Sequence, residues 1–324
     1  MIDYIEAYTE YLKLRRNLSE NTLDAYRRDM KQFFKHLEER GINDAADMTN
    51  ADIVSYIMHL RNYGRSGSTI NRKTASVRAY ADFLCDTGII SRENNPVEGV
   101  KPPKIEKQEI DYLSVEEINN LLELPDDSVR GVRDRAILEI LYGTGIRVTE
   151  LTELRMHDVN FRIGFITCNG EYGKARIIPL GNPCKEALLK YLELSRPKLI
   201  ESRLNSMRNF ENKQEDLKKI LNHEGIKKIE DEDSFLFMNY HGEKLTRQGL
   251  WKIVRRYADE SGIKERLTPQ ILRNSFAAHM IQNGADLKSI QELMGYEDVT
   301  TVQIYLNITK NRIKEVFDRT HPRA

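Results

Sequence analysis

The sequence of 324 residues has few cysteines and no long apolar run. Its three cysteines, Cys85, Cys168 and Cys184, lie far apart and lack the spacing of metal ligands, which favours free thiols in a reducing compartment. No apolar stretch approaches the ~18–20 residues that cross a bilayer, and the first residues alternate polar and apolar types, unlike a secretory signal. We therefore expect a cytoplasmic protein with no membrane partner and no metal site.

The chain also lacks an excess of charge of either sign, because 50 Lys and Arg residues balance 50 Asp and Glu residues. This balance argues mildly against nucleic-acid binding, since most such proteins are basic, although the local distribution of charge is what a polyanion meets. Residues 53–81 contain no acidic side chain. The basic side chains in this stretch are Arg61, Arg65, Arg72, Lys73 and Arg78. The stretch fits either a contact with nucleic acid or a solvated helical face.

The length predicts two domains, and residues 1–99 are expected to form a helical one. Ser19 is a suitable N-cap for a stretch with apolar side chains at helical spacing, and Gly41 follows the end of that stretch. Further helices are expected over 51–60 and 67–88. Residues 100–110 contain prolines and lysines and predict a basic linker.

Residues 111–324 predict a second, mainly helical domain. Ser114 and Glu117 have the spacing of a capping box, and 163–180 form two β-type runs around a glycine-containing turn, which predicts a hairpin. Residues 200–233 are dense in charge and are expected to form a surface insertion. Helices are expected over 131–142, 147–154, 246–260, 268–283, 286–294 and 298–305, and again from 183. The fold class is therefore mainly α with a small β-hairpin.

Several short segments carry a recognisable pattern. In chain order they are Leu18–Leu23 with Tyr26–Asp29, Thr144–Leu151, Arg176–Leu180, Leu267–Arg273, Leu293–Asp298 and Thr300–Tyr305. Each alone is a weak signal, but in this order and spacing they resemble the tyrosine recombinases (the phage integrase family), and the Xer-type bacterial members in particular. The resemblance covers nearly the whole chain except 200–233.

The resemblance implies a core-binding, SAM-like DNA-binding domain over 1–99 and a catalytic domain over 111–324, which close as a clamp on double-stranded DNA. It implies site-specific recombination through a 3′-phosphotyrosine, with no metal or nucleotide cofactor. The residues agree, since the chain has no P-loop and no carboxylate or His/Cys cluster of a metal nuclease. Such a protein serves chromosome segregation or the integration of a mobile element.

Family members assemble as tetramers on DNA by passing a C-terminal exchange helix to a neighbour, which implies homo- or hetero-tetramers here. The tail after Tyr305 has an apolar face with Ile313, Val316 and Phe317 that suits this contact. Packing of the same face on its own domain is the alternative.

The chemistry needs a nucleophile, charge stabilisation and proton transfer at a phosphodiester. The resemblance makes Tyr305 the nucleophile, and Arg147 and Arg273 the phosphate clamp, since a guanidinium is always charged and its fork matches two phosphoryl oxygens. The structural alternatives are ordinary packing for Tyr305, the opening of a helix for Arg147 and pairing with an acid for Arg273.

Three positions depart from the family pattern. Glu171 stands where a lysine is usual, and Gln270 and Tyr296 stand where histidines are usual. Lys174, on the same hairpin as Glu171, is a candidate substitute general acid. Gln270 can hold phosphate or water, and Tyr296 can donate a hydrogen bond to a non-bridging oxygen. His279 is close in sequence but is expected to be a packed helix residue.

The acid-free stretch falls on helices that the family lays across the major groove. Arg65, Arg72, Lys73 and Arg78 are therefore predicted contacts to phosphates or base edges. Weaker candidates on one later helix are Arg247, Lys252, Arg255 and Arg256.

Three functions remain open. The first is an active recombinase, and the second is a catalytically impaired family member that acts as a DNA-binding accessory protein, motivated by the three departures. The third is a topoisomerase-like enzyme that relaxes DNA without strand exchange.

Overall fold

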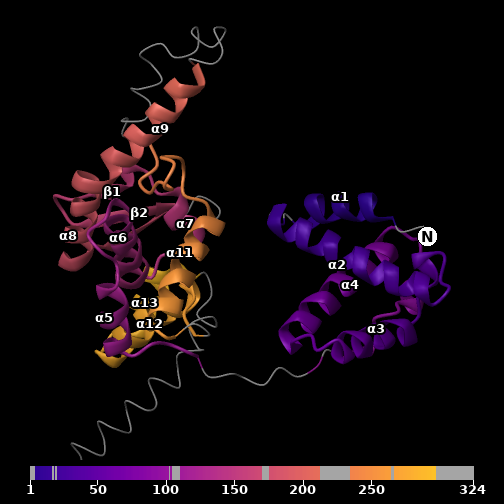
Figure 1. Cartoon of the computed structure of the whole chain (residues 1–324). Coiled ribbons are helices and arrows are strands. Elements are labelled where there is room, and N and C mark those ends of the chain that lie inside the picture. The colour runs from indigo at the N-terminus through magenta and orange to yellow at the C-terminus, as the bar shows by residue number, and fades with distance from the viewer. Residues whose placement is uncertain are drawn as a thin grey trace, which may run out of the picture. The chain divides into compact units, whose positions relative to one another are not determined.

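The computed structural model describes residues 4–16, 18, 20–101, 103, 110–169, 175–211, 234–263 and 266–296, with the backbone alone at residue 16 and over 206–211. The chain divides into two compact units, Met1–Gln108 and Glu109–Ala324, each with its own hydrophobic core (Figure 1). This division falls within the segment 100–110 that the sequence predicts to be a linker. The predicted fold class, mainly helical with a small sheet, is confirmed.

The N-terminal unit packs its helices around aromatic side chains. Its α-helices are α1 (Ile5–Arg16), α2 (Glu20–Glu39), α3 (Asn50–Asn62) and α4 (Gly67–Asp86). The helix α2 buries Leu23, Met30, Phe33, Phe34 and Leu37, the apolar positions that recur at helical spacing in the sequence. Their burial against α4 fixes which face of each helix meets solvent.

The C-terminal unit is built around α6, most of whose side chains are buried. Its helices are α5 (Val115–Glu123), α6 (Val129–Thr144), α7 (Val148–Glu153), α8 (Asn182–Lys190), α9 (Arg196–Glu211), α11 (Arg247–Glu260), α12 (Pro269–Gln282) and α13 (Leu287–Met294). Helices α8 and α12 pack directly on α6, as Figure 1 shows for the centre of this unit. The capping box predicted at the start of α5 is present, with Ser114 and Glu117 each bonding the other's backbone N–H.

The predicted hairpin is part of a three-stranded antiparallel sheet of order β1-β2-β3. Its strands are β1 (Val159–Asn160), β2 (Phe165–Asn169) and β3 (Ala175–Pro179), and Thr167 pairs with Ile177. The short β1 is an addition that the sequence did not predict. The turn between β2 and β3 and the expected helix 298–305 lie outside the described residues.

Helices α8 and α9 are joined without a break by a π-helical segment, Tyr191–Ser195. The hydroxyl of Tyr191 donates to the carbonyl oxygen of Leu236 at 3.0 Å and accepts from the backbone N–H of Met238 at 3.2 Å. Residues 200–211, the start of the predicted surface insertion, are helical because α9 extends to Glu211. Within them, Ile200 is buried.

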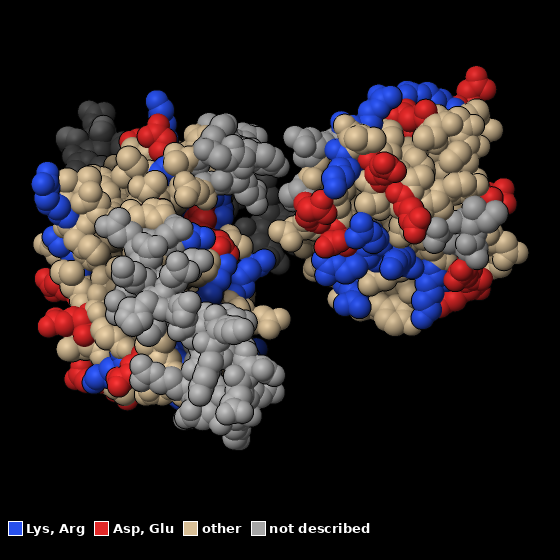
Figure 2. Space-filling view, turned by 90° about the horizontal axis from the view of Figure 1, so that it is seen from above, with Lys and Arg blue, Asp and Glu red and all other residues tan. Residues whose placement is uncertain are grey.

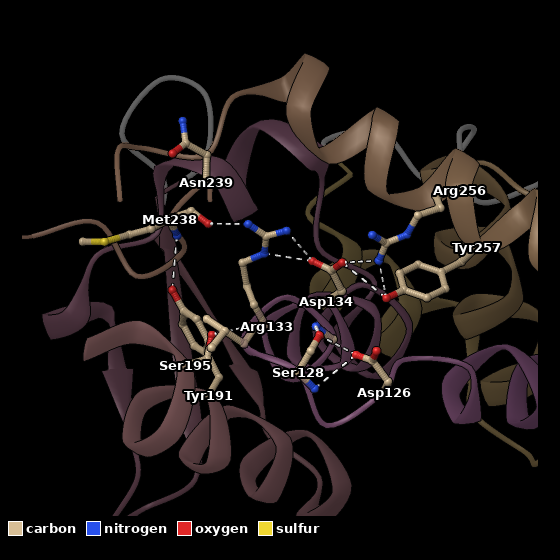
Figure 3. Close-up of polar contacts among 12 residues, drawn as sticks. Asp126, Ser128, Arg133, Asp134, Tyr191, Ser195, Met238, Asn239, Arg256 and Tyr257 are labelled. Carbon is tan, nitrogen blue, oxygen red and sulfur yellow. Dashed lines mark hydrogen bonds and ion pairs between the residues drawn. The ribbon is translucent and has the colours of Figure 1, made fainter. Parts of the chain in front are cut away.

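A buried carboxylate joins α6 to α11 (Figure 3). Asp134, which is 0% exposed, accepts from Arg133 of its own helix at 2.8 Å and from Arg256 of α11 at 2.6 Å. The hydroxyl of Tyr257 lies 3.3 Å from the same carboxylate. These bonds compensate the cost of burying the charge and fix α11 on the central helix.

In the parts of the chain that the structure describes, no helix is long and apolar enough to span a bilayer.

Candidate active site

The turn between α6 and α7 holds Arg147 at the surface of the C-terminal unit. Helix α6 ends at Gly145, which has φ 59° and carries no side chain that would oppose this left-handed conformation. Arg147 is the N-cap of α7 and is tied to Glu150 twice. Its backbone N–H donates to Glu150 Oε2 at 2.8 Å, and its Nη1 lies 3.0 Å from Oε1. The guanidinium is thereby oriented while 38% of the side chain stays exposed.

Arg273 reaches the same place from α12. It is only 3% exposed, and its guanidinium donates to the carbonyl oxygens of Gly145 and of Met294, the latter at 2.5 Å. The structure therefore brings together the two arginines that the sequence predicts as a phosphate clamp, although they are far apart in the chain. The structural alternative for Arg273, pairing with an acid, does not account for it, because its hydrogen bonds go to backbone carbonyl oxygens.

The C-terminal end of α13 accepts hydrogen bonds from three different arginines. Arg176 Nε donates to the carbonyl oxygen of Leu293 at 2.8 Å, Arg273 Nη2 to that of Met294, and Arg147 Nη2 to that of Gly295 at 2.6 Å. The last carbonyls of a helix have no partner within the helix and carry partial negative charge. They therefore hold the arginines in place, and their oxygens are acceptors of the kind that a phosphate also presents.

Tyr296 follows α13 and lies beside both members of the pair. The guanidinium carbon of Arg273 lies 5.0 Å from the centre of the Tyr296 ring, and that of Arg147 lies 5.7 Å from it. Both distances are within the range of a cation–π interaction. The aromatic ring thus stabilises two like charges that repel each other.

Burial and charge perturb the ionisation of the arginine cluster. Burial lowers the pKa of Arg273, and the neighbouring charge of Arg147 lowers it further, while Tyr296 offsets part of the change. Burial tends to raise the pKa of Glu150, but hydrogen bonds from Arg176 and Arg147 outweigh it, and the net pKa is lowered. Glu150 is therefore ionised and partly compensates the positive charges. The remaining excess of positive charge favours an anion.

Two of the three positions that depart from the family pattern, Gln270 and Tyr296, lie within the described residues, and their surroundings differ. Gln270 is exposed on α12, and its amide Nε2 donates to Asn274 Oδ1 at 2.9 Å. Tyr296 lies against the arginines, as described above. His279 is 6% exposed and bonds the Tyr142 hydroxyl through Nδ1 at 3.0 Å, so the expectation of a packed helix residue is confirmed. No imidazole occupies the positions of Gln270 and Tyr296.

The proposed nucleophile Tyr305 lies outside the described residues, as do Glu171 and Lys174. Within the described ranges, no group of three or more His, Cys, Asp or Glu side chains is arranged to hold a metal ion. Cys168 and Cys184 are buried, and burial raises the pKa of each thiol to about 12. Neither thiol is therefore a reactive group at neutral pH.

The N-terminal unit has a surface hollow of about 350 Å³ between α2 and the start of α4. The side chains of Arg28, Arg65, Arg72 and Lys73 line it together with Asp29. Figure 2 shows that basic side chains gather in patches on this unit, with acidic ones beside them. Three of the predicted DNA contacts, Arg65, Arg72 and Lys73, are therefore neighbours.

Lys73 is buried in the wall of this hollow and bonds other side chains of the protein. Its side chain is 5% exposed, and its Nζ donates to Asp29 Oδ1 at 3.0 Å and to Gln32 Oε1 at 2.6 Å. Arg72 also pairs with Asp29 but remains 47% exposed. Lys73 thus makes its hydrogen bonds inside the fold, and the exposed cations of the hollow are Arg28, Arg65 and Arg72.

The other predicted contacts lie elsewhere. Arg78 is half-buried and donates to the carbonyl oxygen of Val100 at 3.0 Å, so it ties α4 to the end of the unit. Arg247 and Lys252 are both exposed on α11, the helix that Asp134 fixes on α6. Their exposure suits either phosphate contacts or plain solvation.

Sequence reasoning missed the two residues that complete the cluster, Glu150 and Arg176. Glu150 follows Arg147 by three residues, the spacing of neighbours on a helix, and this was an available signal. Arg176 lies in a motif segment, but nothing in the sequence indicates that it bonds Glu150, which is 26 residues away.

Comparisons with known proteins identify two family domains and several relatives of the whole chain. The model of the phage integrase family matches residues 111–312, and that of the phage integrase N-terminal SAM-like domain matches residues 5–88. The chain is 40% identical to tyrosine recombinase XerD of Listeria monocytogenes serotype 4b and 37% identical to that of Oceanobacillus iheyensis, over 100% of both chains in each case.

Solved structures share the fold. One is the XerH site-specific recombinase bound to a palindromic difH substrate after cleavage, with a TM-score of 0.67 and 18% identity, covering 98% of this chain and 95% of that one. Another is a lambda integrase dimer bound to a core site, with a TM-score of 0.66 and 17% identity over 93% of each chain.

Proposed function

Because the chain belongs to the phage integrase family and is a tyrosine recombinase of the Xer type, we propose that it cuts and rejoins duplex DNA through a covalent link to Tyr305. The observation that carries the proposal is the convergence of Arg147 and Arg273 at the end of α13, with the ring of Tyr296 beside both. Site-specific DNA recombination is the activity that family membership supports.

In the proposed reaction, Arg147 and Arg273 bind the non-bridging oxygens of the scissile phosphate. Arg273 now donates to two backbone carbonyl oxygens, and Arg147 donates to the carbonyl oxygen of Gly295 and to Glu150. The phosphate oxygens replace carbonyl oxygens as acceptors, while Glu150 continues to hold Arg147. Pre-set positive charge of this kind is usually the largest contribution to catalysis. Burial lowers the pKa of Arg273, and an anion beside its guanidinium acts in the opposite direction by favouring the charged form.

The phenol of Tyr305 gives its proton to a water, and its oxygen forms a bond to phosphorus while the bond from phosphorus to the 5′ oxygen breaks. The 5′ oxygen leaves with a proton, for which we propose Lys174 as the donor. Tyr296 donates a hydrogen bond to a non-bridging oxygen, and Gln270 holds the phosphate or a water. Rejoining is the reverse attack by a 5′ hydroxyl, so the phosphotyrosine conserves the bond energy and no nucleotide cofactor is needed.

The test is to trap the covalent intermediate on nicked duplexes that were selected for binding to the full chain. We expect a denaturation-resistant DNA adduct that Tyr305→Phe abolishes. Tyr240→Phe, the same change at an exposed tyrosine outside the cluster, is the matched control and should leave the adduct intact. Lys174→Ala should slow adduct formation by ~10²–10⁴-fold if Lys174 is the acid. An adduct that persists in Tyr305→Phe refutes the assignment of the nucleophile.

A second candidate is a DNA-binding accessory protein without strand cleavage. It is favoured by the absence of an imidazole at Gln270 and Tyr296, since an amide does not transfer protons and a phenol does so poorly at neutral pH. This candidate predicts tight binding without an adduct. It also predicts that an adduct appears once Glu171→Lys, Gln270→His and Tyr296→His are introduced together.

For the DNA contacts we propose Arg65 and Arg72 in the N-terminal unit, and Arg247 and Lys252 on α11. The hollow that joins Arg65 and Arg72, and the exposure of Arg247 and Lys252, support this choice. Assembly as a tetramer on DNA through the segment after Tyr305 is also a proposal. The mass of the complex on a duplex with two binding sites tests it, and a monomer on each site would contradict it.

A further inference from the structure

Arg176 is a charged residue at the centre of the cluster to which the proposed chemistry gives no role. It lies on β3, and its side chain is 12% exposed. Both of its terminal nitrogens donate to Glu150, Nη1 to Oε1 at 2.6 Å and Nη2 to Oε2 at 2.7 Å. Its Nε donates to the carbonyl oxygen of Leu293 at 2.8 Å. One guanidinium therefore binds the start of α7 and the end of α13 together.

The contacts of Arg176 lead to Arg147 by two routes. Through Glu150, they fix the carboxylate that orients the backbone and the guanidinium of Arg147. Through Leu293, they fix the end of α13, where the carbonyl oxygen of Gly295 accepts from Arg147. Arg176, Glu150, Arg147 and the last turn of α13 thus form a closed ring of hydrogen bonds.

The close approach of Arg176 to Gly295 shows how tightly this ring is packed. A β-carbon added at Gly295 would lie 2.9 Å from Arg176 Nη1 and 3.0 Å from its Cζ. The guanidinium therefore packs directly on the backbone of the residue that precedes Tyr296.

We infer that Arg176 is a positioning residue, which keeps the Arg147 guanidinium in the orientation that binds the scissile phosphate. The inference rests on the proposed function. Glu150 has only 8% of its side chain exposed and needs a permanent positive partner when a phosphate takes up the charge of Arg147. Arg176 supplies this partner without contacting the phosphate itself. A lysine keeps the charge but cannot bond both carboxylate oxygens and a carbonyl in one plane.

The chain offers a matched control in Arg133. Arg133 also binds a carboxylate through two nitrogens, with Nε and Nη2 each 2.8 Å from Asp134 Oδ1, and a backbone carbonyl, that of Met238 at 3.3 Å (Figure 3). Its side chain is 6% exposed, and it lies on the first turns of α6, roughly 20 Å along the helix from Arg147. Arg133→Lys should therefore mimic the loss of stability of Arg176→Lys without touching the clamp.

The first measurement is the rotation rate of the Arg147 guanidinium about its Nε–Cζ bond, by NMR of the full chain labelled with ¹⁵N-arginine and free of DNA. The Arg147 signals are identified by their loss in Arg147→Lys. We expect Arg176→Lys to raise this rate by about tenfold, as the strong charge-assisted bonds that hold Glu150 are weakened, and Arg133→Lys to leave it unchanged. An unchanged rate in Arg176→Lys, or an equal rise in both variants, overturns the inference.

The second measurement is adduct formation on the nicked duplex at saturating protein. Arg176→Lys should lower the rate constant by roughly 10- to 100-fold, with the Kd for DNA within about twofold of that of the unaltered chain. Equal rate constants in Arg176→Lys and the unaltered chain contradict the inference. If the unaltered chain forms no adduct, the proposed function fails, and the rotation rate alone decides the role of Arg176.

Discussion

Gly145 is the position where one added methyl group should affect both the fold and the clamp. A β-carbon there would lie 2.5 Å from Cδ1 and 3.0 Å from Cε1 of Phe276, whose ring is 8% exposed in the core. The left-handed conformation costs alanine roughly 1–2 kcal/mol, and overpacking typically adds about 1–3 kcal/mol. We expect Gly145→Ala to lower the free energy of unfolding by ~2–5 kcal/mol. Because the Gly145 carbonyl also accepts from Arg273, adduct formation should fall as well.

Gly262 provides the control for the conformational cost alone. It has φ +74°, and a β-carbon there would meet nothing within 4 Å, so Gly262→Ala should cost only ~1–2 kcal/mol. The chain has one tryptophan, Trp251 on α11, so its fluorescence during urea unfolding reports the C-terminal unit in both variants. With a slope of ~2–3 kcal/mol per molar urea, an extra ~2 kcal/mol lowers the midpoint by about 1 M. Equal midpoints for Gly145→Ala and Gly262→Ala would refute the clash with Phe276.

Three more expectations follow from buried polar groups. Lys73→Met should destabilise the N-terminal unit by ~2–3 kcal/mol in thermal unfolding, because Asp29 loses a buried partner. The salt dependence of DNA binding should stay unchanged in this variant. If the slope of the logarithm of the binding constant against the logarithm of salt concentration fell by about one, Lys73 would instead be a phosphate contact. Asp134→Asn should cost ~3 kcal/mol in urea unfolding by leaving Arg133 without its counter-charge, and a loss below ~1 kcal/mol would contradict this. Burial lowers the pKa of His279 from its usual 6.5, so the unfolded chain binds a proton more readily than the folded one, and the free energy of unfolding should decline as the pH falls below 6.5. His279→Gln should flatten this decline between pH 6.5 and 5. An unaltered dependence of the free energy of unfolding on pH would contradict the assignment.

Local patterns in the sequence were sufficient to predict much of the fold. The apolar positions of α2, the capping box of Ser114 and Glu117 and the hairpin of β2 and β3 each depend on residues that are close in the chain. The proposed clamp residues Arg147 and Arg273 came from the family pattern, and both donate to carbonyl oxygens at the end of α13.

Pairings between distant residues could not be predicted in this way. Lys73 lies in an acid-free stretch, but its partner Asp29 is on another helix, 44 residues away, and only packing of α2 on α4 shows that the amine is buried. Arg176 was likewise part of a motif with no visible partner until the structure brought it to Glu150. Counting charge along a segment therefore overestimates the cations that remain free for a ligand.

The π-helical segment Tyr191–Ser195 determines which changes of length this part of the chain tolerates during evolution. A π-helical turn closes i→i+5 hydrogen bonds and so holds about one residue more than the α-helical turn that it replaces. Deleting one residue from this segment would therefore restore regular α-helix and leave the rotation of α9 nearly unchanged. Leu199 and Ile200 would then keep their place in the core. A homologue that lost one residue here can keep the apolar positions of α9, whereas one that lost a residue within regular α8 or α9 must also have moved them, because an α-helix turns by about 100° per residue.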